Sequence, residues 1–496
     1  MTTIEDSPAA DETSPAVDMA AAAHETHTGV VVLLGDRAYK IKKPVLTDFL
    51  DFSTTERRER ACRREVELNR RLAAESYLGV GHLQLPGRTT AEPVVVMRRY
   101  PDHDRLRHMV LRGESVDRHL IGIAGLLADF HARSPRSADI DASGTAVAVT
   151  GRWTDTLDVL DDYTDTVLPE TTVTEIRRLA IRYLAGREPL FAGRIADSRI
   201  VDGHGDLLTD DIFCTPGGPV LLDCLEFDDR LRFVDAIDDA AFLAMDLEYL
   251  GRKDLADLFL DAYRERAGDT APRSLIDFYI AYRAVVRAKV DCIRVSQGHG
   301  TAAADARWHL ELAANHLRAT TVRLVLVGGG PGTGKTTLAG GLGTALGAQV
   351  ISTDVVRREL QTRGLLDGET GALNAGLYAP ESVEFVYDTV LLRAQTLLDH
   401  GQSVILDGTW RDPAHRRAAR ETAERTSAAY VELACTTTLA AAQQRIQQRA
   451  STTSDATAQI AADLTTPPWP DAHHVDTGRP LAESLAEAQQ ICCLAI

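Results

Sequence analysis

Lysine is scarce in this chain of 496 residues, which has six lysines, and acidic residues outnumber basic ones by 72 to 54, for a formal net charge of −18. A protein that binds nucleic acid irrespective of sequence needs a basic face to neutralise the phosphates. The densest basic run, residues 56–71, is interleaved with glutamate and is typical of a solvated helix. We therefore expect no nucleic-acid partner.

Long apolar stretches and paired cysteines are also missing. No run of about 18 apolar residues occurs, so we expect no membrane-spanning helix and no membrane partner. The acidic N-terminus lacks the basic region of a secretory signal, and its composition predicts a disordered tail over residues 1–26. The seven cysteines are scattered without a CxxC pair, as expected for reduced thiols in a cytoplasmic protein.

The chain does contain a glycine-rich motif, GGGPGTGKTT at residues 328–337, between an apolar run and a helix-like stretch. A strand, a glycine-rich turn and a helix form the context in which GxxxxGK[ST] binds phosphate. Glycines let backbone N–H groups surround the anion, and the helix points its positive end at it. Lys335 is expected to reach the β- and γ-phosphates of ATP, and Thr336 to hold Mg²⁺. The predicted nucleotide-binding residues here are Gly329, Gly330, Pro331, Gly332, Thr333, Gly334, Lys335, Thr336 and Thr337.

Three aspartates upstream have a spacing that also suits phosphoryl transfer. The loop HGDLLTDD places Asp206 and Asp211 five residues apart, and the apolar strand PVLL then leads to Asp223. One carboxylate can accept the proton of an attacking hydroxyl, and two others can neutralise phosphate charge through Mg²⁺.

Residues before this loop supply a lysine and a glutamate. Residues 29–45 predict a β-hairpin and residues 58–73 a helix. Lys40 on the hairpin, with Glu65 or Glu67 on the helix, are candidates for the ion pair that orients ATP phosphates.

The remaining pattern separates two kinds of domain. A strand is predicted at 93–100, and helical periodicity dominates 103–200 and 235–318. From about residue 321, strands and helices alternate, which predicts a parallel sheet with helices on both faces.

The N-terminal half resembles the aminoglycoside-phosphotransferase-like kinases, and most closely their uncharacterised branch fused to a P-loop kinase-like domain. The motifs that carry the resemblance are AYKIKKPV, RREVELNRRL, VVVMRRYP, HGDLLTDD, LLDCLEF and DAAFLAMDLEY. The resemblance implies a bilobal, α+β protein-kinase-like domain over residues 27–318. An α/β P-loop domain with a parallel sheet is expected over 319–496.

The resemblance also implies roles for the aspartates. Asp206 would be the catalytic base and Asp223 the Mg²⁺ ligand that opens the metal loop. Asp211 stands where the family usually has asparagine. An aspartate there still coordinates Mg²⁺, but it adds negative charge beside a triphosphate.

The same resemblance assigns the ATP-binding strand and helix. Lys40 would hold the phosphates, with Lys42 on the same face as the alternative. Glu65 would pair with the lysine, and Met97 would lie at the hinge beside adenine.

The C-terminal half resembles the gluconate-kinase, zeta-toxin and polynucleotide-kinase-like P-loop enzymes. Asp407 ends an apolar strand, where a carboxylate would hold the Mg²⁺ shell. Asp354 follows another strand, and the resemblance implies that it activates the acceptor hydroxyl. A helix N-cap is an equally weighted and compatible role for Asp354. Arg357 or Arg358 could bind an anionic acceptor.

Two arginines near residue 450 form a further candidate site. Arg445 and Arg449 lie four residues apart, on one face of a helix. They are expected to belong to a lid that contacts the transferring phosphate, and a solvated helix face is the alternative. Trp410 and His415 are weaker candidates for the acceptor pocket, with core packing favoured for Trp410.

The sequence therefore predicts a cytoplasmic phosphotransferase that uses ATP and Mg²⁺ and acts on a small hydroxylated molecule. The main alternative is a nucleotide-binding regulatory ATPase with a degenerate kinase domain. A polynucleotide kinase fits the P-loop half but conflicts with the acidic charge.

Overall fold

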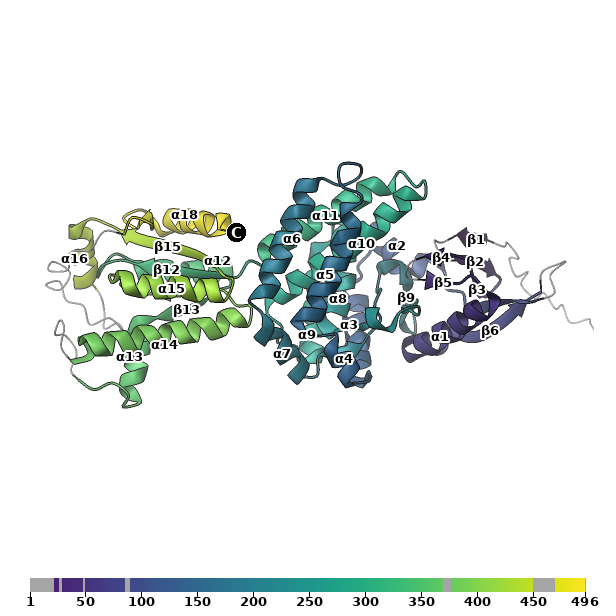
Figure 1. The fold of residues 1–496 in the computed structure, drawn as a ribbon, viewed down its shortest axis with the longest axis horizontal. Coiled ribbons are helices and arrows are strands. Elements are labelled where there is room, and N and C mark those ends of the chain that lie inside the picture. Colours follow the sequence, from purple (N-terminus) through teal and green to yellow (C-terminus); the bar gives the residue numbers. More distant parts are fainter. Residues whose placement is uncertain are drawn as a thin grey trace, which may run out of the picture. The chain divides into compact units, whose positions relative to one another are not determined.

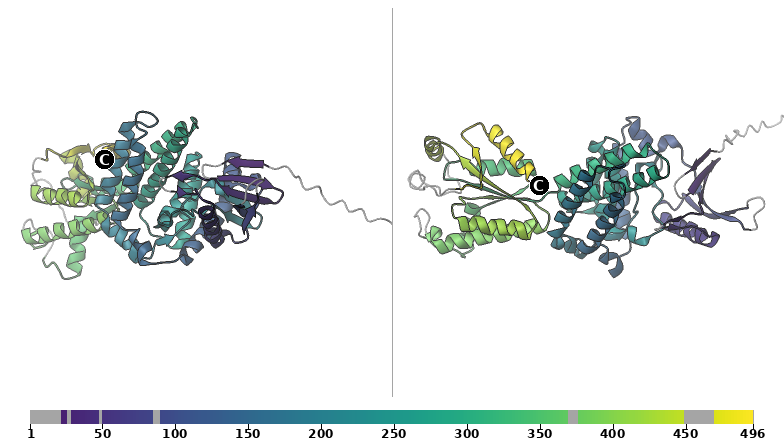
Figure 2. Two further views of the ribbon diagram at one scale, coloured as in Figure 1. Left: turned by 45° about the vertical axis from the view of Figure 1, so that its right-hand side comes forward. Right: turned by 45° about the horizontal axis from the view of Figure 1, so that its top comes forward.

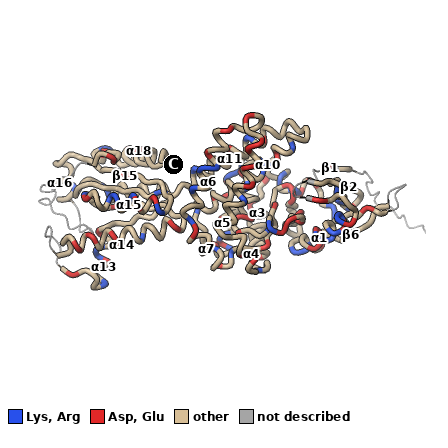
Figure 3. Tube along the Cα trace, in the orientation of Figure 1, with Lys and Arg blue, Asp and Glu red and all other residues tan. Residues whose placement is uncertain are grey.

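The computed structural model describes residues 22–25, 29–47, 50–84, 90–368, 376–448 and 469–495. The chain divides into two compact units: Met1–Arg133 with Gly203–Arg232, and Ser134–Asp202 with Phe233–Ile496. The predicted domain boundary near residue 319 falls inside the second unit, between its helical part and its P-loop part. Lys and Arg are interspersed with Asp and Glu along most elements of both units (Figure 3).

The first unit is built on an antiparallel sheet of five strands in the order β1-β2-β3-β7-β6 (Figure 1). These are β1 (Ala22–Glu25), β2 (Gly29–Leu34), β3 (Arg37–Lys42), β6 (Tyr77–Leu83) and β7 (Glu92–Arg98). The predicted hairpin is confirmed, because β2 and β3 pair up to Leu34 and Arg37. Gly35 supplies the left-handed turn with φ of +57°.

The edge strand β1 departs from the sequence-based expectation. Residues 22–25 belong to the predicted disordered tail, but the structure pairs them with β2, whose apolar run offers them a sheet edge. Residues 1–21 and 26, the rest of that predicted tail, lie outside the described residues.

The predicted helix over 58–73 is confirmed as α1 (Thr55–Ala73). Thr54 caps it by accepting a hydrogen bond from the Arg57 amide at 3.3 Å. Its solvated face carries the Arg/Glu pattern. Its inner face packs on β6 and β7 and buries Glu65 and Asn69.

Short elements complete the first unit. They are β4 (Leu46–Thr47), β5 (Leu50–Asp51), η1 (Asp102–Asp104), α2 (Leu106–Leu111), α3 (Asp117–Arg133), η2 (Thr209–Asp211), β9 (Ile212–Thr215), β10 (Gly218–Leu221) and η3 (Asp229–Leu231). The β9–β10 hairpin leads directly into the segment that carries Asp223.

The helical part of the second unit confirms the predicted helical stretches. Its elements are α4 (Ala138–Ala142), α5 (Ala146–Asp161), α6 (Glu170–Ala185), α7 (Glu188–Ala196), β8 (Ile200–Asp202), β11 (Phe233–Asp235), α8 (Ala236–Tyr249), α9 (Lys253–Ala267), α10 (Arg273–Ser296) and α11 (Ala302–Ala319). Helix α10 packs on both α8 and α11 and is the centre of this part.

A buried histidine links these three helices and gives the fold a pH dependence. His316 Nε2 lies 2.9 Å from Glu248 Oε2, and Nδ1 lies 3.0 Å from Asp277 Oδ1. Burial alone would lower the pKa of this imidazole, but the two carboxylates raise it overall. Its folded pKa therefore exceeds the unfolded value, so protonated His316 stabilises the fold at low pH. This contribution is lost as the pH rises through the folded pKa.

We expect His316→Asn to lower the melting temperature more at about pH 5.5, below the ordinary imidazole pKa, than at about pH 9. Scanning calorimetry at the two pH values measures the difference. Equal losses at both would contradict the ionic role of His316 and leave only a packing role.

The P-loop part has five parallel strands in the order β13-β14-β12-β15-β16. The strands are β12 (Arg323–Gly328), β13 (Gln349–Ser352), β14 (Val404–Asp407), β15 (Ala429–Thr436) and β16 (His473–Asp476). The helical elements are α12 (Lys335–Leu346), α13 (Thr353–Thr362), η4 (Gly376–Tyr378), α14 (Pro380–Asp399), α15 (Pro413–Arg425), α16 (Leu439–Gln447) and α18 (Leu481–Leu494). The predicted parallel sheet is confirmed.

Helices cover both faces of this sheet (Figure 2). Helices α12 and α18 pack together on one face, and α14 packs on β12, β13 and β14. Val325, Leu338, Leu342 and Ala488 are among the core residues between the sheet and α12 and α18.

The cysteines are free, and six of the seven are buried; Cys493 on α18 is exposed. Burial raises the pKa of the Cys62, Cys292, Cys435 and Cys492 thiols to about 12. Within the described residues, every helix is too short or too polar to cross a membrane.

Candidate functional site

In the first unit, β3 presents Lys40 and Lys42 on one face because alternate residues of a strand point the same way. Lys40 Nζ lies 3.0 Å from Glu65 Oε1 and also pairs with Asp223. Lys42 Nζ lies 2.8 Å from Glu65 Oε2 and also pairs with Glu226. The two lysines, which the sequence left as alternatives for one role, therefore both contact Glu65. Glu67 instead pairs with Arg64 at 3.1 Å, on the exposed side of α1.

Burial and the neighbouring charges together determine the protonation states of Glu65 and Lys40. Glu65 is fully buried, and burial alone would raise its carboxyl pKa, yet the two lysines lower the pKa to about 2. Burial alone would likewise lower the pKa of Lys40, but Asp223 and Glu65 hold it well above its usual value. Both groups are therefore ionised at neutral pH.

Asp223 occupies an unusual backbone position. Its φ is +66°, in the left-handed region that residues with a Cβ rarely adopt. Its amide donates a hydrogen bond to Tyr77 Oη at 3.0 Å, and the next amide, of Cys224, donates to Asn69 Oδ1 at 2.8 Å. Asn69 in turn donates from Nδ2 to the Glu65 carbonyl at 2.9 Å. Helix α1 therefore fixes the segment that carries Asp223.

The loop with Asp206 and Asp211 lies beside Asp223. His204 is fully buried and its Nε2 lies 3.0 Å from the Leu222 carbonyl, which joins the loop to the strand that leads to Asp223. The pKa of Asp211 is raised well above its usual value by burial and then by Asp223 and Asp206. Neighbouring carboxylates that repel one another can be neutralised by a divalent cation that one or two of them bind.

The predicted hinge residue Met97 lies on β7 opposite Ala38 of β3. Both side chains are buried in one apolar cluster with Tyr77 and Leu222. This apolar surface adjoins Lys40, two residues along β3 from Ala38. The adenine-binding role of Met97 stays a prediction.

The second site lies where β12 ends and α12 begins. Gly334 precedes α12 with φ of +84°, and Lys335, Thr336 and Thr337 form the first turn of the helix. The turn between these elements contains the other predicted P-loop residues, Gly329, Gly330, Pro331, Gly332 and Thr333. Thr333 Oγ1 donates to the Gly330 carbonyl at 2.8 Å and closes the turn.

Asp407, at the end of β14, lies opposite Thr336. Thr336 Oγ1 donates to Asp407 Oδ2 at 2.9 Å, while Oδ1 is buried and has no hydrogen-bond partner among the described residues. Burial raises the pKa of this carboxyl, and Lys335 opposes the shift. An unsatisfied carboxylate oxygen beside a threonine hydroxyl fits the shell of a Mg²⁺ ion.

Neither site forms a complete metal cage from protein groups alone. Among the described residues, no three His, Cys, Asp or Glu side chains are grouped closely enough to hold a metal. Mg²⁺ at phosphate sites uses one or two carboxylates, water and the phosphates themselves, so two protein ligands are sufficient.

A substitution at Gly332 tests the conformation of the P-loop directly. It has φ of +76°, and a Cβ there would lie 2.5 Å from the Ala442 carbonyl oxygen. Gly332→Ala is expected to weaken ATP binding at this loop and to cost about 1–3 kcal/mol of stability. Gly340→Ala is the matched control, because a Cβ at Gly340 meets nothing within 4 Å. Nucleotide titration and denaturant unfolding of both variants check this, and equal behaviour of the two would contradict it.

Asp354 lies in the first turn of α13, which begins at Thr353 after Ser352 as the N-cap position. The N-cap role considered for Asp354 is therefore wrong, because the N-cap position is Ser352, two residues earlier. Its carboxylate pairs with Arg357 Nη1 at 2.7 Å, and it is close enough to Asp407 to help raise that residue's pKa. The role of Asp354 as proton acceptor stays a prediction.

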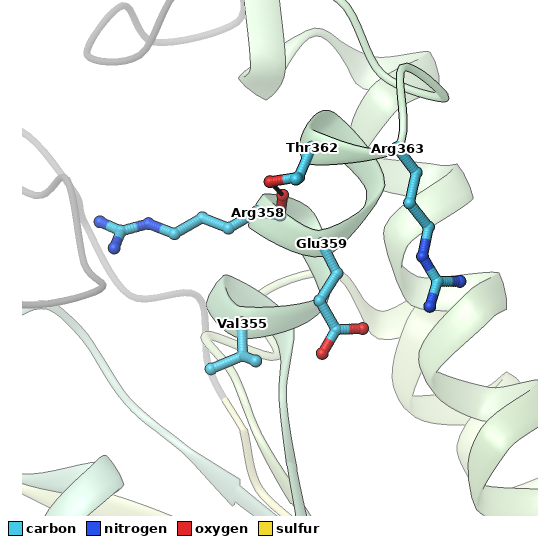
Figure 4. Close-up of a pocket in the computed structure, with 5 residues that line it drawn as sticks. All are labelled: Val355, Arg358, Glu359, Thr362 and Arg363. Atoms are coloured by element: carbon cyan, nitrogen blue, oxygen red, sulfur yellow. Dashed lines mark hydrogen bonds between the residues drawn. The ribbon is translucent and has the colours of Figure 1, made fainter.

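The two arginines of α13 differ in their surroundings. Arg357 is buried over the Tyr378 ring at 4.5 Å from its centroid. Arg358 lines a hollow of about 310 Å³ and points away from Glu359 and Arg363 (Figure 4). The hollow is lined by Val355, Arg358, Glu359, Thr362 and Arg363.

Arg445, on α16, lies against the P-loop. Its Nη2 donates to the Thr477 carbonyl at 2.7 Å, and its Nη1 would lie 3.4 Å from a Cβ on Gly334. Thr477 Oγ1 donates to the Thr436 carbonyl at 2.8 Å and also contacts the Thr333 carbonyl. Sequence reasoning did not identify Thr477, because it lies more than 140 residues from the loop it contacts. Arg449, the other predicted lid arginine, lies outside the described residues.

Trp410 is fully buried, as core packing requires, and donates from Nε1 to the Leu406 carbonyl at 3.1 Å. His415 stacks on Tyr387 with ring centroids 4.0 Å apart. The rings of Trp410 and His415 both pack against the Tyr387 ring.

Residues 324–465 match the AAA domain family. The chain is 55% identical over 486 residues to the uncharacterised protein Rv2004c of Mycobacterium tuberculosis, covering 98% of this chain and 96% of that one. The same values hold for a counterpart in Mycobacterium bovis.

Three solved structures are similar in part. A choline/ethanolamine kinase family protein from Mesorhizobium loti is 13% identical, with a TM-score of 0.38, covering 61% of this chain and 94% of that chain. Aminoglycoside 2'-phosphotransferase-IIIa in its GDP complex is 14% identical, with a TM-score of 0.39, covering 61% and 95%. A gluconokinase from Sinorhizobium meliloti is 18% identical, with a TM-score of 0.27, covering 36% and 94%.

The described elements up to α11 combine an antiparallel five-stranded sheet with helices, and those from β12 onward form a P-loop domain with a parallel five-stranded sheet. The predicted α+β class of the N-terminal part and α/β class of the C-terminal part are confirmed.

Proposed function

The chain belongs to the same family as these mycobacterial proteins, and we propose that it is a kinase that uses ATP and Mg²⁺ to phosphorylate a small hydroxylated molecule. The observation that carries this proposal is the contact of Lys40 with both Glu65 and Asp223 in the first unit. In kinases, the phosphates of ATP are bound by a lysine that a glutamate holds in place, and by metal that a nearby carboxylate holds.

In the first site, the chain's own residues would bind and orient the reactants. Lys40 binds the phosphates, Glu65 holds Lys40 in place, and Asp206 accepts the proton of the acceptor hydroxyl. The hydroxyl oxygen forms a bond to the γ-phosphorus as the bond to the β–γ bridging oxygen breaks and ADP leaves. Asp223 and Asp211 would hold Mg²⁺, which neutralises phosphate charge when bound.

In the second site, the backbone N–H groups of the P-loop and Lys335 would bind the triphosphate. Thr336 and Asp407 would hold Mg²⁺, and the unsatisfied Asp407 Oδ1 supports this role. Asp354 would accept the acceptor's proton, and the position of Arg445 against Gly334 supports a role in stabilising the transferring phosphate.

The acceptor is proposed to be a small molecule in the cytoplasm. The net charge of −18 disfavours nucleic acid as acceptor, and seven free cysteines fit a reducing compartment. The same charge favours a cationic acceptor, such as an aminosugar, for the first site.

The test is transfer from γ-labelled ATP into a deproteinised extract of small metabolites by the full chain. A labelled small product supports the proposal. ATP binding without any labelled product would contradict it and favour a regulatory ATPase. Labelling of 5′-hydroxyl oligonucleotides that weakens with salt would point to a polynucleotide kinase instead.

A further inference from the structure

We propose that Lys42 and Glu226 form a positioning pair that holds the Asp223 segment against α1 when Mg·ATP binds. This inference rests on the proposed function of the first site. It assigns to both residues a role that neither Lys40 nor Glu65 can supply alone.

The geometry is a line of five alternating charges: Asp223, Lys40, Glu65, Lys42 and Glu226. Each oxygen of Glu65 serves a different lysine, at 3.0 Å for Lys40 and 2.8 Å for Lys42. The Asp223 side chain is 43% exposed, whereas Lys42 and Glu226 are 3% and 10% exposed. The Asp223 end is therefore open to a ligand and the Lys42 end is closed.

This difference in exposure separates the roles of the two lysines. A triphosphate can reach Lys40 and draw its ammonium away from Asp223. Lys42 is covered, with its ammonium 4.8 Å from the centroid of the Phe52 ring, and stays with Glu65. Because a buried carboxylate that loses its cations is costly, Lys42 keeps Glu65 neutralised while Lys40 turns to the phosphates.

The backbone explains why Asp223 needs such support. Its left-handed conformation is retained only where the surrounding structure fixes it. Cys224, the next residue, is hydrogen-bonded to Asn69 of α1, and Glu226 holds the segment two residues further on through Lys42. Loss of the pair frees that end of the segment and displaces Asp223 from a metal-binding position.

The experiment uses the full chain with Lys335→Met, so that the P-loop site contributes little to binding. The probe is mant-ATP, a fluorescent ATP analogue, titrated with Mg²⁺ and again with EDTA. Lys42→Met is expected to weaken Mg-dependent binding about tenfold, a typical coupling within an ion-pair network. Binding in EDTA is expected to fall less than Mg-dependent binding, because Asp223 acts on the nucleotide through metal, whereas Lys42 also neutralises Glu65 when Lys40 turns to the phosphates.

Rescue and matched controls separate positioning from folding. Lys42→Arg keeps the charge and is expected to retain most of the Mg-dependent affinity. Lys43→Met is the matched control, since Lys43 follows β3 and pairs with Glu25 at the surface, 2.6 Å away. It is expected to bind like the parent.

A further variant guards against simple unfolding. Replacing both members, in Lys42→Met/Glu226→Leu, leaves neither of them as an unpaired charge, and Glu65 keeps Lys40 as its partner in the absence of ligand. This double variant is expected to fold, as judged by circular dichroism, and still to lose Mg-dependent affinity. If it folds and binds Mg·mant-ATP like the parent, or if metal-free binding falls equally, the positioning role is wrong.

Failure of this inference can be told from failure of the proposed function. Lys40→Met and Asp223→Asn are measured in the same background. If neither weakens mant-ATP binding, the first site is not an ATP site and the proposed function fails there. If both weaken it while Lys42→Met and Glu226→Gln do not, only the positioning role fails.

Discussion

Replacing Lys335 by Met is expected to remove ATP-dependent transfer from the P-loop half, with a loss of about 10²–10³-fold in rate. Lys335 carries the positive charge in the first turn of α12, and this charge acts to lower the pKa of the Asp407 carboxyl. Without it, the triphosphate faces Asp407 and Asp354 with one fewer positive charge to offset theirs. Lys335→Arg is expected to recover little, because a guanidinium cannot replace a compact ammonium within a closed loop.

The measurement is the rate of transfer from labelled ATP, together with the amount of ATP bound per chain at saturation. Arg417→Met is the control, since it removes an exposed cation of α15 from the same part of the chain. Undiminished transfer and binding in Lys335→Met would contradict phosphate binding by this loop.

Replacing Asp206 by Asn is expected to lower transfer at the first site by about 10²–10⁴-fold while ATP still binds. The amide keeps the shape of the side chain but cannot accept the proton of an attacking hydroxyl. Because Asp206 also helps to raise the pKa of Asp211, its neutralisation is expected to ease metal binding at Asp211. The variant should therefore separate chemistry from binding, with affinity for Mg·ATP retained or improved.

Asp210→Asn is the matched control for this prediction. Asp210 lies in the same loop with its side chain 52% exposed, and it pairs with Arg107 at 3.7 Å. It is expected to transfer phosphate like the parent. Parallel losses of ATP binding and transfer in Asp206→Asn would indicate a structural effect and contradict the role of a base.

Local sequence patterns predicted the elements on which both sites are built. The hairpin of β2 and β3, the helix with Glu65 and the P-loop between a strand and a helix each depend on residues close in sequence. Strand periodicity also places Lys40 and Lys42 on one face. The Lys40–Glu65 pair follows from these elements and from the family resemblance.

The contacts that escaped prediction join distant segments. Glu226 pairs with a lysine 184 residues earlier, and no local pattern distinguishes it from a solvated acid. One signal was present: a second lysine two residues after Lys40 and a second acid three residues after Asp223. The N-cap role of Asp354 was wrong for a different reason. A side chain can cap a helix only from the residue just before its first turn, and a sequence pattern does not fix that residue.

The burial of six cysteines has a practical consequence for work on this chain. Thiol reagents attack the thiolate, and burial keeps the covered sulfurs out of their reach. Cys493 on α18 is the exposed exception, and α18 packs on the helix that begins at Lys335. A maleimide dye added to the native chain would thus attach beside the P-loop helix and leave every residue of both sites unaltered.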